Sequence, residues 1–342
     1  MSRTLGRAGE TMHWKLKAAL QNAISLGPSN LSHATYYWAQ RHFGGLKKIN
    51  PVKRLSAGIE ICKRIKRLNY QPQGKVFFEV GTGRAPIVPM AYWLMGAKRI
   101  ITVDINPYLK GELVKESLQY MEENENEIQS LFGALLDQHR FSELRDFYRS
   151  APFSMEAFLD FLNIEYIAPG DAANTGLSDE SIDFHTSHTV LEHIPKEVLV
   201  QILKEGNRIT VANGLFIHKI DYSDHFSHSD KTISPINFLQ YSESEWNKYA
   251  GNRYMYMNRL RHDDFIRMFE SIKHRILMAD PDEDKCVHDL ITQGGLKLDA
   301  RFKNKSIETL STTGAWIVSK KTKQNLQEHM PINFRGASFG TR

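Results

Sequence analysis

Short apolar runs alternate with longer segments of helical periodicity from residue 75 onward. The first two runs carry an acid near their ends, at Glu79 and Asp104. Further runs lie at 166–168, 181–188, 214–218, 274–279 and 314–320. Runs of this length, separated by helical segments, are typical of strands in a largely parallel sheet. The pattern predicts an α/β domain over residues 75–320.

The segments outside this alternation have their own signatures. Residues 1–74 predict a helical, basic extension or lid. Residues 107–165 exceed what a crossover between strands needs, so they predict a helical insertion. Residues 222–260 are rich in aromatic and basic side chains and predict a substrate-binding segment. Residues 321–342 have few apolar anchors and predict a loosely ordered tail.

A glycine pair separates the first strand from the helix after it. Gly81 and Gly83 allow a tight turn and a close approach of backbone to ligand. Pro86 suits the first turn of a helix, whose free N–H groups attract an anionic group. Asp104 lies about 20 residues further on, where a carboxylate can accept both hydroxyls of a ribose. These residues predict a nucleoside-binding βαβ unit.

Two details separate this loop from a dinucleotide fingerprint, namely Glu79 before the glycines and Pro86 in place of a third glycine. The acid-x-Gly-x-Gly pattern, with Asp104 after the second strand, resembles the class I S-adenosylmethionine-dependent methyltransferases. The resemblance implies that the loop lies against the methionine part of S-adenosylmethionine (SAM) and that the second acid holds its ribose. The cofactor-binding residues implied here are Glu79, Gly81, Thr82, Gly83, Asp104, Ile105 and Asn106.

Downstream motifs continue the resemblance in the order of that family. Asp171 and Ala172 stand where the family contacts adenine. The segment Ser187-His-Thr-Val-Leu-Glu-His193 is similar to the turn after its fourth strand, which adds Ser187 and His188 to the cofactor-binding residues. The resemblance covers about residues 75–222. It implies a Rossmann-like, doubly wound, seven-stranded sheet, mostly parallel with an antiparallel last strand.

A second dense group of polar residues, 218–230, follows the fifth strand and therefore emerges at the carboxyl edge of the sheet, where ligands bind. One His or Asp could act as a general base. Alternatively, Asp221, His225 and His228 could hold a divalent metal, or the side chains could cap turns. The catalytic candidates are Asp221, Asp224, His225 and His228, together with His193 in the Leu-Glu-His turn.

The sulfonium of SAM is an activated methyl donor, so the protein mainly has to position the acceptor and exclude water. A hydroxyl is a poor nucleophile and needs a base or metal nearby, which the His/Asp loop offers. We therefore expect O-methylation of a sugar, polysaccharide or specialised metabolite. N- or C-methylation of a small metabolite stays open.

Charge is unevenly distributed. Residues 1–74 carry 13 Lys/Arg and 2 Asp/Glu, a net charge of +11, whereas the remainder carries −6. The amphipathic stretch 53–68 explains much of this excess, either as a helix packed on the domain or as a surface for a phosphorylated substrate, nucleic acid or membrane. No RNA-binding motif accompanies the charge, so nucleic acid is not the expected partner.

Bulk composition changes the picture little. Two distant cysteines, Cys62 and Cys286, give neither a zinc pattern nor a disulfide framework. No apolar signal core or membrane-spanning run is present, so a cytoplasmic protein is expected. A homodimer stays open. The rival functions are a nicotinamide-dependent oxidoreductase and a nucleic-acid-binding protein that uses the basic N-terminus.

Overall fold

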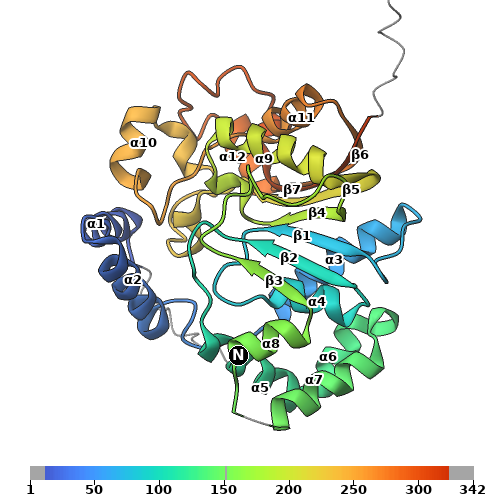
Figure 1. Ribbon diagram of the computed structural model, residues 1–342. Coiled ribbons are helices and arrows are strands. Elements are labelled where there is room, and N and C mark those ends of the chain that lie inside the picture. Colours follow the sequence, from blue (N-terminus) through green and yellow to red (C-terminus); the bar gives the residue numbers. More distant parts are fainter. Residues whose placement is uncertain (1–11, 151, 323–342) are drawn as a thin grey trace, which may run out of the picture.

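The computed structural model describes residues 12–150 and 152–322, and the predicted tail lies almost wholly outside them. A seven-stranded sheet forms the centre of the molecule, in the order β3-β2-β1-β4-β5-β7-β6 (Figure 1). Strand β7 runs antiparallel to β5 and β6, and the other neighbours are parallel. The strands are β1 (Val76–Val80), β2 (Arg99–Val103), β3 (Ile164–Ile167), β4 (Ile182–His188), β5 (Thr210–Asp221), β6 (His274–Glu283) and β7 (Thr312–Lys321).

Helices cover both faces of this sheet, which explains why the central strands read as continuous apolar runs. Neighbouring residues Phe77 and Phe78 of β1 are both fully buried, because they point into different apolar clusters. Helices α3 and α4 cover one face, and α9 and α11 cover the other. Their bounds are α3 (Val52–Arg67), α4 (Ile87–Leu94), α9 (Lys196–Ile209) and α11 (His262–Ser271).

The predicted amphipathic stretch is helix α3, and its apolar stripe packs onto the sheet domain. Leu55, Ile59 and Ile65 are buried in the main core. Gly58 lets α3 approach α4 closely, since a Cβ there would lie 2.6 Å from the Cβ of Ala91. Helix α3 therefore belongs to the core of the central sheet and not to the pair of helices before it.

The segment 107–165 is helical, as its length and pattern predict. It contains α5 (Gly111–Glu123), α6 (Glu125–Phe132), the short 3₁₀ helix η1 (Gly133–Leu135), α7 (Gln138–Ser150) and α8 (Met155–Phe161). Ion pairs join α5 and α7, including Arg145 to Glu122 at 2.8 Å. The helices close the end of the sheet at β3 (Figure 1).

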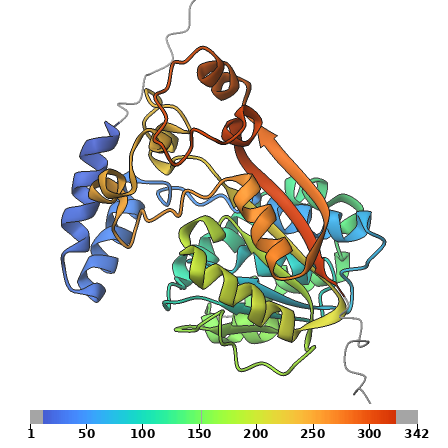
Figure 2. The ribbon, with the colours of Figure 1, turned by 90° about the horizontal axis from the view of Figure 1, so that it is seen from above.

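The first two helices, α1 (Trp14–Ser25) and α2 (Ser29–Phe43), stand beside the sheet domain, next to α10 (Figure 2). Trp14 packs against Phe226, Trp246 and Tyr249. Tyr36 of α2 stacks on Tyr254, with ring centroids 4.2 Å apart. The pair of helices is thus held by the segment 222–260 and, through the ion pair of Arg41 with Glu116, by α5.

The remaining helices of the described residues are short. They are η2 (Leu191–His193), η3 (His225–His228), η4 (Asn237–Gln240), α10 (Glu243–Ala250), α12 (Lys285–Thr292) and α13 (Ile307–Ser311). Within residues 12–150 and 152–322, none of the helices is long and apolar enough to cross a membrane.

Candidate active site

The glycine loop leaves β1 as a tight turn. Gly81 has φ +87° and Gly83 has φ +70°, conformations that side chains rarely adopt. A Cβ on Gly81 would lie 2.5 Å from a methyl group of Val190, in the turn after β4. The amide of Gly83 donates to the Oδ2 of Asp104 at 2.9 Å, which ties the loop to the end of β2.

Substitution of Gly81 by alanine is expected to destabilise the protein. Strain at positive φ should contribute about 1–2 kcal/mol, and the clash with Val190 should add about 1–3 kcal/mol. Gly176→Ala is the matched control, because Gly176 has φ +69° and open space around it. Urea unfolding of both variants checks the difference, and equal losses would contradict a role for close packing on Val190.

The two acids of the loop differ in their surroundings. Glu79 is buried and its Oε2 has no hydrogen-bond partner among the described residues. Burial raises the pKa of Glu79 well above its usual range, against the positive charge of Arg54. Burial also raises the pKa of Asp104, against backbone hydrogen bonds led by that from Gly83. Glu79 is near the end of β1 and Asp104 directly follows β2, so both carboxyl groups lie at the edge of the sheet beside the glycine loop.

The residues next to Asp104 include an exposed apolar side chain. Ile105 is 75% exposed, unusual for an isoleucine beside the end of a central strand. The side chain of Asn106 donates to the hydroxyl of Tyr108 at 2.9 Å. On the next loop, Asp171 is exposed and caps its own turn by accepting from the Ala173 amide at 2.8 Å, while Ala172 is buried. The exposed side chain of Ile105 could therefore pack against an aromatic ring of a ligand.

The end of β4 holds the last two predicted cofactor residues. The side chain of Ser187 is fully buried and bonds the Nδ1 of His218 at 2.7 Å, so only its backbone faces the loop region. His188 is partly exposed and its ring lies against Trp316. Burial, together with the positive charges of Arg54, Lys219 and Lys53, lowers the pKa of His188 to about 4.

The turn after β4 connects the glycine loop to a group of histidines and acids. Two residues after Val190, Glu192 is buried, and His193 follows it. The Nδ1 of His193 lies 2.9 Å from the carbonyl oxygen of Tyr256. The ring of His193 contacts that of His225, with centroids 4.8 Å apart. Burial lowers the pKa of His193 to about 4.

Strand β5 ends beside this turn and supplies the rest of the group. The Oδ2 of Asp221 lies 3.3 Å from the Nε2 of His225 and 3.8 Å from that of His228. The other oxygen of Asp221 accepts from the amide and hydroxyl of Ser223, at 2.8 and 2.6 Å. Although burial opposes its ionisation, hydrogen bonds from His225 and Ser223 hold the pKa of Asp221 well below its usual range. We call Glu192, His193, Asp221, His225 and His228 the histidine–carboxylate cluster.

Asp224 makes contacts of a different kind, although it is close to this cluster in sequence. One oxygen caps η3 by accepting from the amide of Phe226 at 2.8 Å, and the other accepts from the side chain of Asn237 at 2.9 Å. Burial raises the pKa of Asp224 to about 6. Its contacts are those of the turn-capping alternative.

Glu192 was not among the residues that the sequence pattern singled out, although it lies in the Leu-Glu-His motif. Both of its carboxyl oxygens are buried without a hydrogen-bond partner among the described residues. Burial raises the pKa of Glu192 well above its usual range, and the negative charge of Asp221 acts in the same direction. The sequence pattern also gave no sign that Asn258 supports the turn after β4. The side chain of Asn258 donates to the carbonyl oxygens of Leu191 and Ile194 at 2.8 and 2.9 Å.

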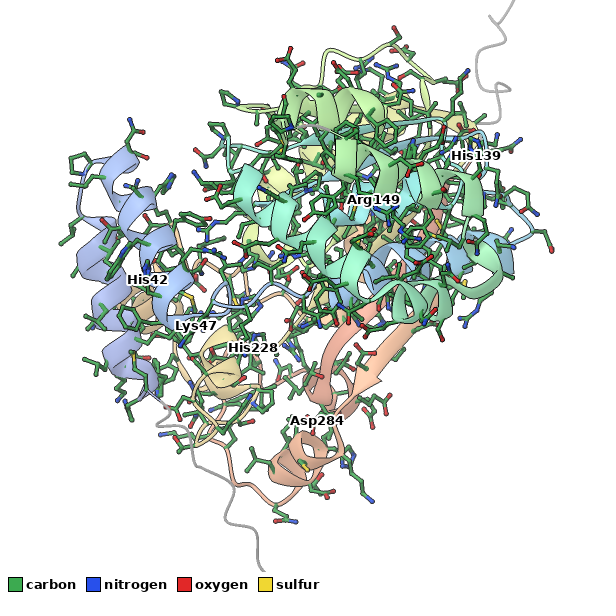
Figure 3. The ribbon with its side chains drawn as sticks, turned by 90° about the horizontal axis from the view of Figure 1, so that it is seen from below. His42, Lys47, His139, Arg149, His228 and Asp284 are labelled. Carbon is green, nitrogen blue, oxygen red and sulfur yellow. The ribbon has the colours of Figure 1, made fainter. Side chains whose placement is uncertain are left out.

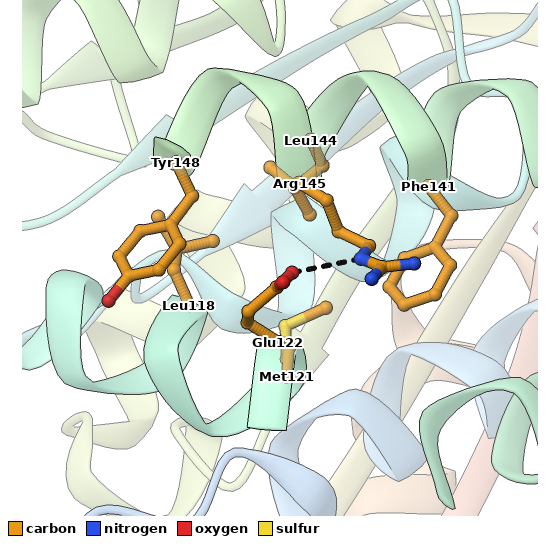
Figure 4. Close-up of a pocket in the computed structure, with 7 residues that line it drawn as sticks. All are labelled: Leu118, Met121, Glu122, Phe141, Leu144, Arg145 and Tyr148. Atoms are coloured by element: carbon orange, nitrogen blue, oxygen red, sulfur yellow. Dashed lines mark hydrogen bonds and ion pairs between the residues drawn. The ribbon is translucent and has the colours of Figure 1, made fainter. Parts of the chain in front are cut away.

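A small hollow elsewhere in the molecule offers no comparable chemistry. It lies between α5 and α7 and is bordered by the ion pair of Arg145 and Glu122 (Figure 4). Its remaining lining is apolar or aromatic, from Leu118, Met121, Phe141, Leu144 and Tyr148. The candidate site is therefore the sheet edge with the glycine loop and the histidine–carboxylate cluster.

No protein-family model and no curated protein matches the chain. Among solved structures, an S-adenosylmethionine-dependent methyltransferase from Mesorhizobium loti is 8% identical, with 76% of this chain and 96% of that chain covered and a TM-score of 0.41. The geranyl diphosphate C-methyltransferase from Streptomyces coelicolor is 10% identical, with 78% and 79% covered and a TM-score of 0.42. The PH0226 protein from Pyrococcus horikoshii is 12% identical, with 76% and 90% covered and a TM-score of 0.40.

The sheet itself identifies the fold. It has seven strands, is mostly parallel with an antiparallel last strand, β7, and has a glycine turn between β1 and α4, as the sequence resemblance implies. The predicted seven-stranded α/β architecture is confirmed. The chain has the fold of the class I S-adenosylmethionine-dependent methyltransferases.

Proposed function

We propose that the protein transfers the methyl group of SAM to a hydroxyl oxygen of a small molecule or glycan. The observation that carries the proposal is the contact between Gly81 and Val190, because the cluster begins two residues later at Glu192. A cofactor bound at the glycine loop would therefore have acid–base groups next to it.

The nucleoside part of the cofactor has suitable partners at the ends of β2 and β3. Asp104 has a second oxygen, whose nearest recorded donor is the Asn106 amide at a long 3.4 Å, so it can accept from a ribose hydroxyl. The exposed Ile105 can cover one face of the adenine. Glu79, Gly81 and Thr82 are proposed for the methionine part, with Asp171 and Ala172 near the adenine edge.

The cluster supports a hydroxyl acceptor in particular. In the transfer, the acceptor oxygen bonds the methyl carbon, the bond from carbon to sulfur breaks, and its electron pair stays on sulfur as S-adenosylhomocysteine. The hydroxyl proton must leave, and a positioned base speeds that loss. His228 is the exposed imidazole of the cluster, so it can accept the proton from a bound substrate. Placing the oxygen in line behind the methyl group supplies the rest of the rate enhancement.

Positive charge flanks the same edge and favours an acidic acceptor, such as a phosphorylated one. Lys53 and Arg54 lie at the start of α3 and are exposed. Their charges act on His188, and that of Lys53 acts also on His228, so both basic residues lie near the site. Lys219 of β5 is also near but already pairs with Asp282.

Substitution of Asp104 by alanine is expected to weaken SAM binding by about 1–3 kcal/mol, if its carboxylate accepts ribose hydroxyl bonds. Calorimetric titration with SAM measures the change in Kd. Glu165→Ala is the control, because Glu165 is a half-exposed surface acid paired with Arg99 on the neighbouring strand. Equal affinity for SAM in the wild type and Asp104→Ala would remove the ribose assignment.

The same titration separates the proposal from its rival. A nicotinamide-dependent oxidoreductase would bind NAD and not SAM, and that result would overturn the methyltransferase proposal. A panel of hydroxylated acceptors, with and without phosphate groups, then tests methyl transfer directly. Transfer only to amines or carbon acceptors would reject the O-methylation part alone.

A further inference from the structure

We propose that Glu192, His193, Asp221 and His225 form a binding site for one divalent first-row transition-metal ion. The ligands come from two neighbouring elements at the sheet edge. Glu192 and His193 lie in the turn after β4, whereas Asp221 ends β5 and His225 begins η3. His228 lies at the exposed side of the same group.

The ligand atoms fall in two overlapping groups. Those of Glu192, His193 and His225 are all within 4.8 Å of one another, and so are those of Asp221, His225 and His228. His225 belongs to both groups, so it marks the point where an ion would be held. Bonds of about 2.0–2.2 Å from nitrogen and oxygen ligands place the donors of one ion about 3–4 Å apart. Small side-chain movements would complete the site.

Glu192 provides the second, independent observation. It is 2% exposed, and neither carboxyl oxygen has a hydrogen bond of normal geometry or a cation among the described residues, although the backbone N–H groups of Glu192 and Asp221 face it. Buried carboxyl groups are normally satisfied, because an unpaired one is strongly destabilising. The equally buried Asp224 shows the normal case, since both of its oxygens are hydrogen-bonded. A metal ion would satisfy Glu192 and could also bind the Nε2 of His225, which faces the Oδ2 of Asp221 at 3.3 Å.

Outer contacts orient two of the ligands as metal sites require. The carbonyl oxygen of Tyr256 accepts from the Nδ1–H of His193, which leaves the Nε2 lone pair for an ion. Ser223 donates twice to the Oδ1 of Asp221, which directs Oδ2 toward His225.

The donor set selects the kind of ion. Imidazole nitrogens combined with carboxylates suit Zn²⁺, Mn²⁺, Fe²⁺ or Co²⁺, whereas Ca²⁺ and Mg²⁺ prefer oxygen ligands alone. The role of the ion rests on the proposed function. Bound to the acceptor hydroxyl, it would lower the pKa of that group, the proton would pass to His228, and the oxygen would then attack the methyl carbon of SAM.

The test measures metal binding without reference to activity. Chelator-treated, folded full-length protein is titrated calorimetrically with Zn²⁺, and with Co²⁺ while its visible absorption is recorded. We expect one ion per chain and Co²⁺ bands typical of nitrogen and oxygen ligands. Glu192→Gln and His225→Gln should each lower the affinity about 100-fold or more, beyond the loss usual for an outer contact. His139→Gln and Cys286→Ser are the matched controls. Both residues are exposed, so these variants should leave the metal affinity unchanged.

Two outcomes would overturn the metal site. One is no binding of Zn²⁺ or Co²⁺ by the folded wild type, and the other is equal affinity in the wild type and in His225→Gln, whose side chain is partly exposed and can be replaced without opening the core. SAM titration of the same samples separates this result from the proposed function. Normal SAM binding without a metal would reject the ion alone, whereas metal binding without SAM binding would reject the methyltransferase.

Discussion

Substitution of Asp221 by asparagine is expected to lower kcat for methyl transfer by about 10²–10⁴-fold, the usual contribution of acid–base assistance, with the Kd for SAM unchanged. Asparagine keeps an oxygen that accepts both hydrogen bonds from Ser223, so the local fold should persist. Its amide would replace the negative oxygen that lies 3.3 Å from His225. The change therefore removes the charge that supports the imidazole, and a metal ligand if an ion is bound.

The measurement uses SAM with a labelled methyl group and the best acceptor from the panel. Asp179→Asn is the matched control, because Asp179 is an exposed aspartate in the loop before β4 and pairs with Arg208 of α9. If Asp221→Asn keeps the kcat of the wild type, Asp221 has only a structural role in the turn after β5. A loss of SAM binding in step with kcat would instead place Asp221 in the cofactor site.

The fold could be predicted well where one sequence pattern has one structural solution. The apolar runs expected at 274–279 and 314–320 lie within β6 and β7, because such runs are local signals. The antiparallel direction of the last strand followed from the resemblance, since periodicity alone does not fix strand direction. The fifth run was expected to begin at residue 214. In the structure β5 starts at Thr210, and its pairing with β4 shifts between Thr210 and Leu215.

The site was predicted less completely, for a physical reason. Glycine turns and strand ends are local features, so Gly81, Gly83 and Asp104 could be found from their spacing. Whether an acid such as Glu192 faces solvent or lies buried depends on segments distant in the chain. Asn258 holds the carbonyls on both sides of the Glu192–His193 turn from more than sixty residues away, and no local pattern records that contact.

The protein is also expected to lose stability steeply on acidification, because three histidines are buried as neutral groups in and beside the sheet. His185, His218 and His274 are at most 5% exposed. Burial lowers the pKa of His185 to about 3 and that of His274 to about 4, and it lowers the pKa of His218 well below its usual range. The positive charges that face them lower these pKa values further: His274 acts on His185, both of these act on His218, and Lys321 acts on His274.

The sign follows from proton linkage. Between about pH 6.5 and these lowered pKa values, the unfolded chain binds protons that the folded chain excludes, so stability present at neutral pH is lost as the pH falls. The free energy of unfolding should drop by about 2 kcal/mol between pH 7 and pH 5 for each of His185 and His274, since each pKa unit corresponds to about 1.4 kcal/mol. Urea unfolding at both pH values measures the loss.

His185→Phe isolates one of these contributions. Neither ring nitrogen of His185 has a hydrogen-bond partner among the described residues, and the ring stacks on Phe216. A phenyl ring should therefore be tolerated at pH 7 and should reduce the drop at pH 5 by about 2 kcal/mol. His139→Phe is the control, because the side chain of His139 is exposed, at the edge of the molecule in Figure 3. An identical drop in the wild type and in His185→Phe would mean that His185 is not neutral in the fold, or that the acid lability arises at the carboxylates instead.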